Sequence, residues 1–325
     1  NIGNALATEN TNYKLNGDVV VNKDSHLNIS GQAEITDSVS LNDANINVNK
    51  GALKTADLSV TGNSQLIGAV NADKLNAVAG ASLAIGNNNG AGKLTVETAD
   101  LNGGMIFLDP AWNNGIEGAS GLAVKDVTSG LNGAYVAGQN SKLSFGADLA
   151  AADAAFTRSG ETWSNSGVTA GAYVDSTVDV ANGSITVDGS LTTAPTTVPA
   201  NGSVKFADNS MLMVNASKIS DTQAAITGVA TADISANSKL YIDNAEKDKT
   251  YKIIDGTVAN WNVDNILSNN KLLKFTVDTD ANTVTTTSQS VKAAYGDAVI
   301  AGDVYDAAVL VVGAAADFVA KAADE

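Results

Sequence analysis

Side chains that could perform catalysis are scarce in this chain of 325 residues. There is no cysteine, and His26 and Arg158 are the only histidine and the only arginine. A serine protease needs a serine, a histidine and an acid acting together, and the Gly-Asp-Ser-Gly setting of such a serine is absent. His26 lies in DSHLN at an outward strand position, so we expect an exposed, structural residue. One histidine without cysteine also argues against a zinc site.

Pairs of carboxylates suggest a second kind of chemistry, the cleavage of polysaccharides. Asp148 with Asp153, and Asp175 with Asp179, are candidate pairs. Such enzymes need clustered carboxyl groups, and a cationic group that stabilises developing charge. Aromatic residues that would stack on sugars make up 5% of the chain, and cations other than Arg158 would have to be lysines. These acids are equally well explained as solvated surface residues, so we predict no catalytic residue and no enzymatic activity.

Calcium is a ligand that the composition leaves open, because Asp and Asn are abundant. The nonapeptide GGxGxD repeat is missing, GNNNGAGK at residues 86–93 resembles it only loosely, and there is no EF-hand loop. GAGK in that stretch lacks the spacing of a P-loop and the serine or threonine after its lysine. We therefore assign no cofactor-binding and no metal-binding residue, and we expect no cofactor.

The charge balance narrows the choice of partners. Lys and Arg number 19 against 35 Asp and Glu, which gives a formal net charge of −16. Nucleic-acid binding needs clustered basic residues, and an acidic surface repels anionic membranes, so we expect neither partner. The lack of cysteine has two explanations of equal weight: a large core needs no disulfide, or the chain must stay threadable through a pore.

The elements that would position any site form a repeat. Apolar residues come in pairs at i and i+2, the spacing of strands with one buried face, and Gly, Asn, Asp and Ser separate the pairs. The pairs recur at a nearly constant spacing. Successive residues are 19, 20 and 17 positions apart in the series Leu27, Ile46, Leu66 and Leu83, and Val204 follows Ile185 after 19 positions. TADL occurs twice, 43 residues apart, which is close to two repeats.

A period near 20 residues, built from short strands and polar turns, predicts an all-β parallel β-helix. Leucine-rich repeats have the same length, but their Leu/Asn consensus is missing. A β-sandwich also uses many short strands; the length of the chain without a domain linker favours the β-helix. Asn-Ser pairs precede several strands, as in GQNSKLSFG at Gly138–Gly146. We expect these pairs at equivalent corners, with their amides bonding the neighbours above and below.

The repeat weakens between Gly103 and Asp179. MIFLDPAW predicts a strand that ends in a turn at Pro110, DLAAADAAF (Asp148–Phe156) predicts a short helix, and Thr157–Gly167 predicts a surface loop. A ligand-facing decoration is one interpretation of this stretch. We favour an ordinary insertion into the repeat.

The sequence predicts three segments. Residues 1–249 form the β-helix, and LTTAPTTVPANG (Leu191–Gly202) is one of its loops rather than a linker. Residues 250–290 gather bulky apolar side chains such as Trp261 and contain the hairpin signal DTDAN. We expect this segment to cap the end of the core. The Ala-rich residues 291–325 form a helix or a linker.

Three features carry a resemblance: the GxNSxLxxG style of repeat, the MIFLDPAW segment, and the terminal TYKIIDG…LLKFTVDTDANTVT. In these the chain resembles the passenger domain of a type V autotransporter from a Gram-negative bacterium, of the adhesin type rather than the protease type. The resemblance covers most of the chain at the level of pattern. The missing serine-protease motif departs from the protease subgroup and argues against proteolysis.

The resemblance implies a right-handed β-helix that is exported through the periplasm and outer membrane and displayed on the bacterial cell surface. Residues 250–290 resemble an autochaperone-like region. The Ala-rich tail resembles the linker toward a translocator β-barrel, which would be a partner in the full-length protein. The lack of cysteine suits passage of an unfolded chain through a narrow pore.

The predicted function is that of a cell-surface adhesin. Polar faces rich in Asn, Thr, Ser and Asp would bind the identical passenger on neighbouring cells, or host glycans and proteins, through many weak hydrogen bonds. The family includes members that drive bacterial aggregation and biofilm formation, so self-association is the first expectation. The alternatives are a polysaccharide-processing enzyme on the same scaffold, with three or more acids around a groove, and a structural stalk.

Overall fold

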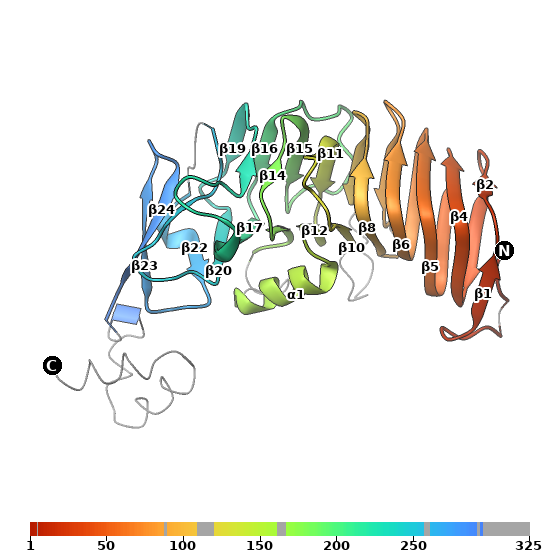
Figure 1. The fold of residues 1–325 in the computed structure, drawn as a ribbon, viewed down its shortest axis with the longest axis horizontal. Coiled ribbons are helices and arrows are strands. Elements are labelled where there is room, and N and C mark those ends of the chain that lie inside the picture. The colour runs from red at the N-terminus through yellow and green to blue at the C-terminus, as the bar shows by residue number, and fades with distance from the viewer. Residues whose placement is uncertain are drawn as a thin grey trace, which may run out of the picture.

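The protein is built mainly from parallel β-strands. The computed structural model describes residues 1–4, 6–87, 90–108, 120–160, 167–256, 261–290 and 293–294. Within these ranges nineteen strands join in one large sheet, and the strands follow one another along the long axis of the molecule (Figure 1). The prediction of an all-β chain with parallel strands is confirmed.

The large sheet contains three ladders of parallel strands, which we call ladders one, two and three. Ladder one comprises β3 (His26–Ser30), the first parts of β5 (Asn45–Thr61) and β6 (Asn63–Ala77), β7 (Ser82–Ile85), β9 (Met105–Leu108), β11 (Asn132–Ala137), β15 (Asn182–Val187), β16 (Ser203–Phe206) and β19 (Thr231–Ile234). Ladder two comprises β1 (Asn12–Leu15), the first part of β4 (Gln32–Asn42), the middle of β5 and β6, the first part of β8 (Gly92–Asp100), β10 (Ser120–Val124), β12 (Ser141–Phe145), β13 (Ala170–Val174), β17 (Ser210–Asn215), β20 (Lys239–Asp243) and β22 (Ile266–Ser268).

Ladder three and a few smaller elements complete the fold. Ladder three comprises β2 (Val19–Val21) and the last parts of β4, β5, β6 and β8. A separate parallel pair joins β14 (Val178–Asp179) and β18 (Ile226–Thr227), and an antiparallel sheet joins β21 (Thr250–Lys252), β24 (Thr283–Ser288) and β23 (Leu273–Asp278). The helices are α1 (Leu149–Arg158) and the 3₁₀ turns η1 (Ala216–Lys218) and η2 (Val263–Asn265).

The register of ladder one confirms most of the predicted repeat. Leu27 pairs with Ile46, and Ile46 pairs with Leu66. The expected pairing of Leu66 with Leu83 is wrong, because Leu66 pairs with Ile85. Leu83 and Ile85 are both buried and both point inward. Because side chains alternate with a period of two, hydrophobicity alone does not separate registers that differ by two residues.

Further along the chain one repeat holds its register and another does not. Ile185 pairs with Val204 as the spacing predicts. The two TADL tetrapeptides are out of register, because Thr98 pairs with Lys74, which itself pairs with Asp57. The second tetrapeptide is therefore shifted by two residues from the first.

The turns that lead into ladder one share a backbone conformation. Asp24, Asp43, Gly62 and Gly80 all have positive φ, and each precedes a strand of this ladder. A side chain at Gly62 would also have to displace the carboxylate of Asp43, since its Cβ would lie 2.2 Å from Oδ1. The Gly, Asn and Asp residues between the apolar pairs are thus needed at corners where the chain turns left-handed.

Three Asn-Ser pairs, at 140–141, 209–210 and 237–238, lie at equivalent corners before strands of ladder two, whereas the pair at Asn63 begins β6 in ladder one. The buried hydroxyls of Ser141, Ser210 and Ser238 each donate to the carbonyl three residues earlier, over 2.6, 2.5 and 2.7 Å. The expectation that the amides bond the neighbouring levels holds for Asn237, whose Nδ2 donates to Asp208 over 3.5 Å. It is wrong for Asn140, whose buried Nδ2 has no hydrogen-bond partner among the described residues. The serine hydroxyl closes each turn from within.

The core runs through all three ladders as one apolar cluster, from Val21 to Val284. A second cluster lies outside ladder two, where Phe156 of α1 packs with Tyr173 and Met213. The predicted helix is confirmed, and Asp148 caps it by accepting a hydrogen bond of 2.8 Å from the backbone nitrogen of Ala151. α1 therefore covers an outer sheet face that would otherwise expose apolar side chains.

The remaining insertions agree with the sequence in part. β9 confirms the strand in MIFLDPAW, whereas its turn at Pro110 lies outside the described residues. The surface loop expected at 157–167 begins too early, because Thr157 and Arg158 belong to α1, and residues 161–166 are not described. Leu191–Gly202 is a loop as predicted, since it connects β15 to its ladder neighbour β16.

The C-terminal segment changes the direction of pairing. β23 and β24 form the predicted antiparallel hairpin, and Trp261 is buried with 4% of its surface exposed. β22 also lies in this segment and pairs in parallel with β20. The last level of parallel strands thus lies within residues 250–290, the segment that the sequence assigns to the cap. The helix or linker expected from residue 291 lies outside the described residues, apart from residues 293 and 294.

Candidate functional site

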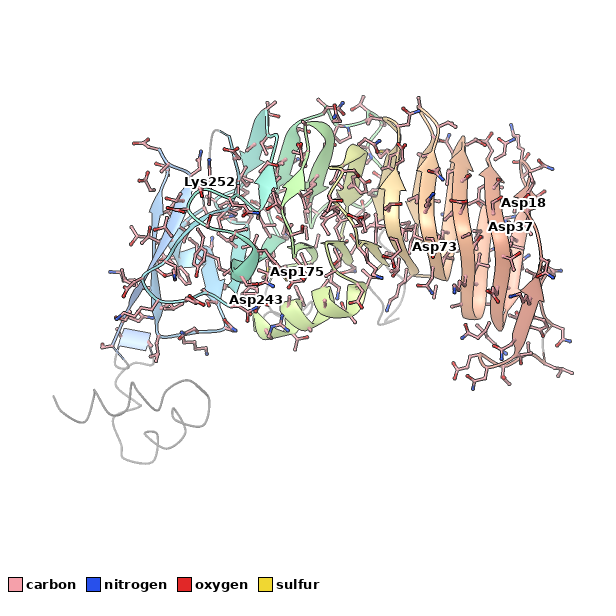
Figure 2. The ribbon with its side chains drawn as sticks, viewed as in Figure 1. Asp18, Asp37, Asp73, Asp175, Asp243 and Lys252 are labelled. Carbon is pink, nitrogen blue, oxygen red and sulfur yellow. The ribbon has the colours of Figure 1, made fainter. Side chains whose placement is uncertain are left out.

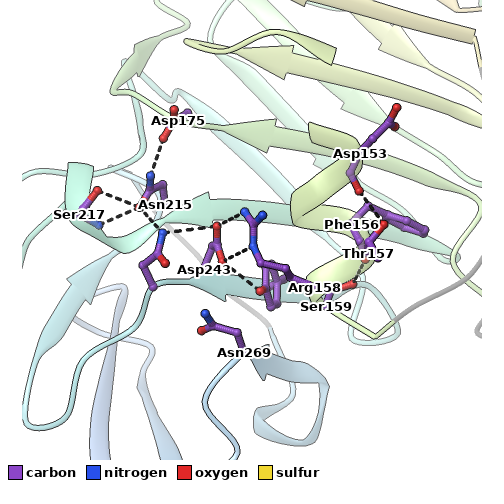
Figure 3. Close-up of polar contacts among 12 residues, drawn as sticks. Asp153, Phe156, Thr157, Arg158, Ser159, Asp175, Asn215, Ser217, Asp243 and Asn269 are labelled. Carbon is purple, nitrogen blue, oxygen red and sulfur yellow. Dashed lines mark hydrogen bonds and ion pairs between the residues drawn. The ribbon is translucent and has the colours of Figure 1, made fainter. Parts of the chain in front are cut away.

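A column of polar residues stands where four successive strands of ladder two end. Asp175 follows β13, Asn215 and Asp243 close β17 and β20, and Asn269 follows β22. The column alternates carboxylates and amides at the spacing of neighbouring strands, about 4.8 Å. Figure 3 shows these residues beside Arg158, the last residue of α1.

Asp243 is the centre of this group and is completely buried. Its carboxylate accepts hydrogen bonds from Nε and Nη2 of Arg158, at 3.1 and 2.5 Å, and from the hydroxyl of Tyr241 at 3.0 Å. The hydrogen bond to Asp243 raises the pKa of Arg158 above its usual value. Burial, and then the nearby Asp243 charge, raise the pKa of Tyr241. The ion pair fastens the C-terminal end of α1 to the sheet.

The amide of Asn215 bonds Asp175 directly and is connected to Asp243 through Nδ2 of Asn244, which also donates to Asp243 over 3.5 Å. Its Nδ2 donates to Asp175 over 2.6 Å, while its Oδ1 accepts from the hydroxyl of Ser217 at 2.9 Å and from Nδ2 of Asn244 at 3.3 Å. Burial, and then the charge of Asp175, raise the pKa of Tyr173 to about 12. Asp175, Asn215 and Asp243 are therefore connected in one network, whereas Asn269 accepts a hydrogen bond from the neighbouring Ser268.

Lys142 is a second buried charge and lies near the N-terminal half of α1. It forms an ion pair with Asp153 and lies 5.5 Å from the centre of the Phe156 ring. Burial lowers the pKa of Lys142 to about 8, whereas the carboxylate and the ring both favour the ammonium form. We expect Lys142 to be charged at neutral pH. The two ion pairs hold α1 at two separate points.

The structure separates the acids that the sequence grouped as possible catalytic pairs. Asp148 caps α1, Asp153 pairs with Lys142, and Asp175 belongs to the strand-end column. Asp179 accepts from the backbone nitrogen of Ala181 at 2.8 Å in a turn. Arg158 is itself bound to Asp243. These contacts give each of these acids a structural role.

The outer face of ladder one, near the N-terminus, is a row of hydrogen-bonded polar side chains. Nδ2 of Asn47 donates to Asn28, and Nδ2 of Asn45 donates to Nδ1 of His26, over 3.1 and 3.3 Å. His26 is exposed, as the sequence predicts, and accepts through Nδ1. Both bonds join β3 to β5, so these side chains cross-link neighbouring levels outside the backbone hydrogen bonds.

Ladder three presents similar groups in the same part of the molecule. The hydroxyl of Ser38 donates to Asp18 over 2.6 Å. Figure 2 shows Asp18, Asp37 and Asp73 among the N-terminal strands, whereas Asp175 and Asp243 lie close to α1. Solvent-facing polar groups thus line the N-terminal strands, and the acids near α1 are tied into the network described above.

The residues that the structure describes contain no group of three or more His, Cys, Asp or Glu side chains that could hold a metal ion. None of their helices combines the length and the apolar character needed to cross a membrane.

Comparisons of the chain with models of protein families, with curated proteins and with solved structures found no match. The inference of function therefore starts from the geometry. Sequence reasoning missed the bond between Arg158 and Asp243, which lie 85 residues apart. The one available signal was that a chain with a single arginine places it directly after an amphipathic Ala-rich stretch.

Proposed function

We propose that the chain is a right-handed parallel β-helix of the kind found in autotransporter passenger domains. Three parallel ladders that share one apolar cluster support the β-helix. Repeats near 20 residues with left-handed corners agree with it. The handedness and the secretion route rest on the resemblance of the sequence. Residues 250–290 would act as the cap of the β-helix, with the buried Trp261 closing its core.

We propose that the function is adhesion by self-association between copies displayed on neighbouring bacterial cells. One observation carries this proposal: the N-terminal strands repeat solvent-facing amide, hydroxyl and carboxylate side chains that are partly or fully exposed. Asn28 with Asn47, and Ser38 with Asp18, are examples. A single contact of this kind is weak, but many parallel contacts between two cell surfaces add up to stable adhesion.

The same contacts support a non-catalytic role. The candidate acids have structural partners, and the single arginine is bound to a buried carboxylate. Incubation of the purified chain with a panel of polysaccharides should release no reducing sugar. Release that disappears when an acid such as Asp175 is changed to Asn would favour the enzyme alternative.

The direct test is to display the chain on non-aggregating bacteria through an unrelated surface anchor. We expect these cells to clump and settle faster than cells that carry the anchor alone. Clumping should stop when soluble chain is added in excess, because the soluble copies occupy the contact sites. Equal settling of the two strains would overturn the proposal.

A further inference from the structure

The outer face of ladder two differs from the other N-terminal faces because its charges alternate. Lys14 on β1 pairs in register with Glu34 on β4, and Glu34 pairs with Lys54 on β5. The next residue in this column is the uncharged Asn71 on β6. A column of plus, minus, plus and neutral groups therefore runs over four levels of an otherwise acidic molecule.

The first two charges of the column already interact. Nζ of Lys14 lies 3.0 Å from Oε2 of Glu34, and both side chains remain about half exposed. This hydrogen bond, and then the Lys14 charge, lower the pKa of Glu34. Lys54 is exposed and forms no ion pair with any residue that the structure describes. The column thus keeps accessible charge of both signs.

A neighbouring column on the same face supplies a difference in side-chain size. In this column Asn12 on β1 pairs with Gln32 on β4. The next two levels contribute Ala52 on β5 and Ala69 on β6, which pair with each other. The first two levels therefore carry long amide side chains, and the next two levels carry methyl groups. Both columns change character at one place, between the levels of β4 and β5.

This face is self-complementary when a second copy lies on it with its long axis antiparallel to that of the first. A two-fold axis parallel to the strands, midway between the levels of β4 and β5, places Glu34 of each copy opposite Lys54 of the other. The same axis places Gln32 opposite Ala52, so that a long side chain meets a short one. Lys14 then faces Asn71, whose amide oxygen can accept its hydrogen bond.

We propose that the outer face of ladder two, over its first four levels, is the surface on which two copies of this chain associate antiparallel, through reciprocal Glu34–Lys54 ion pairs. The proposal rests on the self-association proposed above and names its contact surface. An antiparallel contact suits copies that approach from two opposing cell surfaces. Four levels at about 4.8 Å give a short contact, so adhesion would come from many such contacts acting together.

Charge exchange tests this surface. Chains carrying Glu34→Lys or Lys54→Glu are displayed on cells of two colours, and mixed clumps are counted by flow cytometry. Either variant alone places like charges opposite each other, and we expect about fivefold fewer clumps than for the original chain. A mixture of the two variants restores opposite charges at both positions, so two-coloured clumps should form at close to the original frequency.

The Glu34→Lys variant separates this contact from a general charge effect. It lowers the net negative charge, so it would increase clumping if only the overall repulsion between chains mattered. Lys93→Glu is the matched control for Lys54→Glu, because Lys93 is exposed on the same ladder one level beyond the proposed contact. We expect Lys93→Glu to clump like the original chain.

The outcomes separate this proposal from the proposed function. If the original chain clumps and both variants clump equally well, self-association is correct and the surface is wrong. Loss of clumping in both variants without rescue in the mixture would also overturn the reciprocal pairing. If the original chain does not clump, the proposed function itself fails. Circular dichroism of each purified variant checks that its fold is intact.

Discussion

The strands before residue 100 and those between residues 105 and 243 share one core but differ on their outer faces. β4 alternates buried and partly exposed residues along its length, whereas every residue of β10, β12 and β13 is buried. In the middle region α1 and the loops cover the sheet from outside. The N-terminal region therefore offers bare sheet faces to a partner on its successive levels, whereas in the middle region partly exposed residues of this kind lie mainly on β16 and β19 of ladder one.

The two regions also use ion pairs differently. Both side chains of the Lys14–Glu34 pair are about half exposed, whereas the carboxylate of Asp243 is completely buried beside Arg158. An exposed pair contributes little to stability because water solvates each partner well. A buried carboxylate becomes costly once its partner is removed. Ion pairs thus stabilise the structure of the middle region, whereas in the N-terminal region they remain accessible to a partner.

Arg158→Ala should give the largest loss of stability. It leaves Asp243 buried without its cation, a loss that typically costs about 3–5 kcal/mol. Because the Arg158 side chain is 42% exposed, water partly replaces it, and we expect a cost near the lower end of that range. The free energy of unfolding, measured by urea denaturation, checks this value. We also expect α1 to become sensitive to proteases, because its C-terminal attachment is gone.

A double substitution provides the control for Arg158→Ala. Arg158→Met with Asp243→Leu removes both charges and keeps apolar volume, so most of the lost stability should return. If Arg158→Ala costs less than about 1 kcal/mol, the ion pair does not hold α1, and the contrast between the two regions is overstated.

Alkaline pH should weaken the middle region next. Burial raises the pKa values of Tyr135 and Tyr241, and it raises that of Tyr173 to about 12. The folded protein therefore keeps phenolic protons that the unfolded chain loses near the ordinary pKa of 10.0. The sign follows from linkage: this stability is present below pH 10 and is lost as the pH rises toward 12.

Tyrosinate absorbance at 295 nm, recorded together with circular dichroism, measures this effect. The buried tyrosines should ionise only as the β-signal falls. Tyr173→Phe should move the transition to higher pH, because one buried ionisable group is gone. Full ionisation near pH 10 with an unchanged circular dichroism spectrum would show that these phenols are accessible.

Lys14→Ala should have the smallest effect on stability. Both partners of its ion pair are about half exposed, and exposed pairs often contribute nothing measurable. We expect the urea midpoint to stay within experimental error of the original chain. A clear shift of the midpoint would mean that the N-terminal charges stabilise the fold, and it would weaken their interpretation as a recognition surface.

The sequence was most informative where one face of a strand is exposed. Alternation around Leu27, Ile46 and Leu66 predicts both the strands and their partners. It does not distinguish Leu83 from Ile85, because both point into the core. In the middle region, residues such as Tyr173 and Met213 point outward and are still apolar, since α1 covers them. Alternation disappears there, and with it the signal of the repeat.

The sequence did not predict the polar network around Asp243, for a different reason. Arg158 reaches Asp243 only because α1 folds back across several levels of ladder two, and neither residue is near the other in the chain. Local patterns predict the helix and its Asp148 cap, because helix capping depends on neighbouring residues. They contain no information on which strand end the helix reaches.

Lysine reactivity tests the central claim, that the bare N-terminal faces rather than the covered middle region mediate self-association. Dispersed and clumped chains are acetylated briefly, and the modification of each lysine is measured by mass spectrometry. We predict that Lys14 and Lys54 lose reactivity in the clumped sample, while the half-exposed Lys205 and the exposed Lys218 of the middle region keep theirs. Unchanged reactivity of Lys54 together with protection of Lys205 and Lys218 would contradict it.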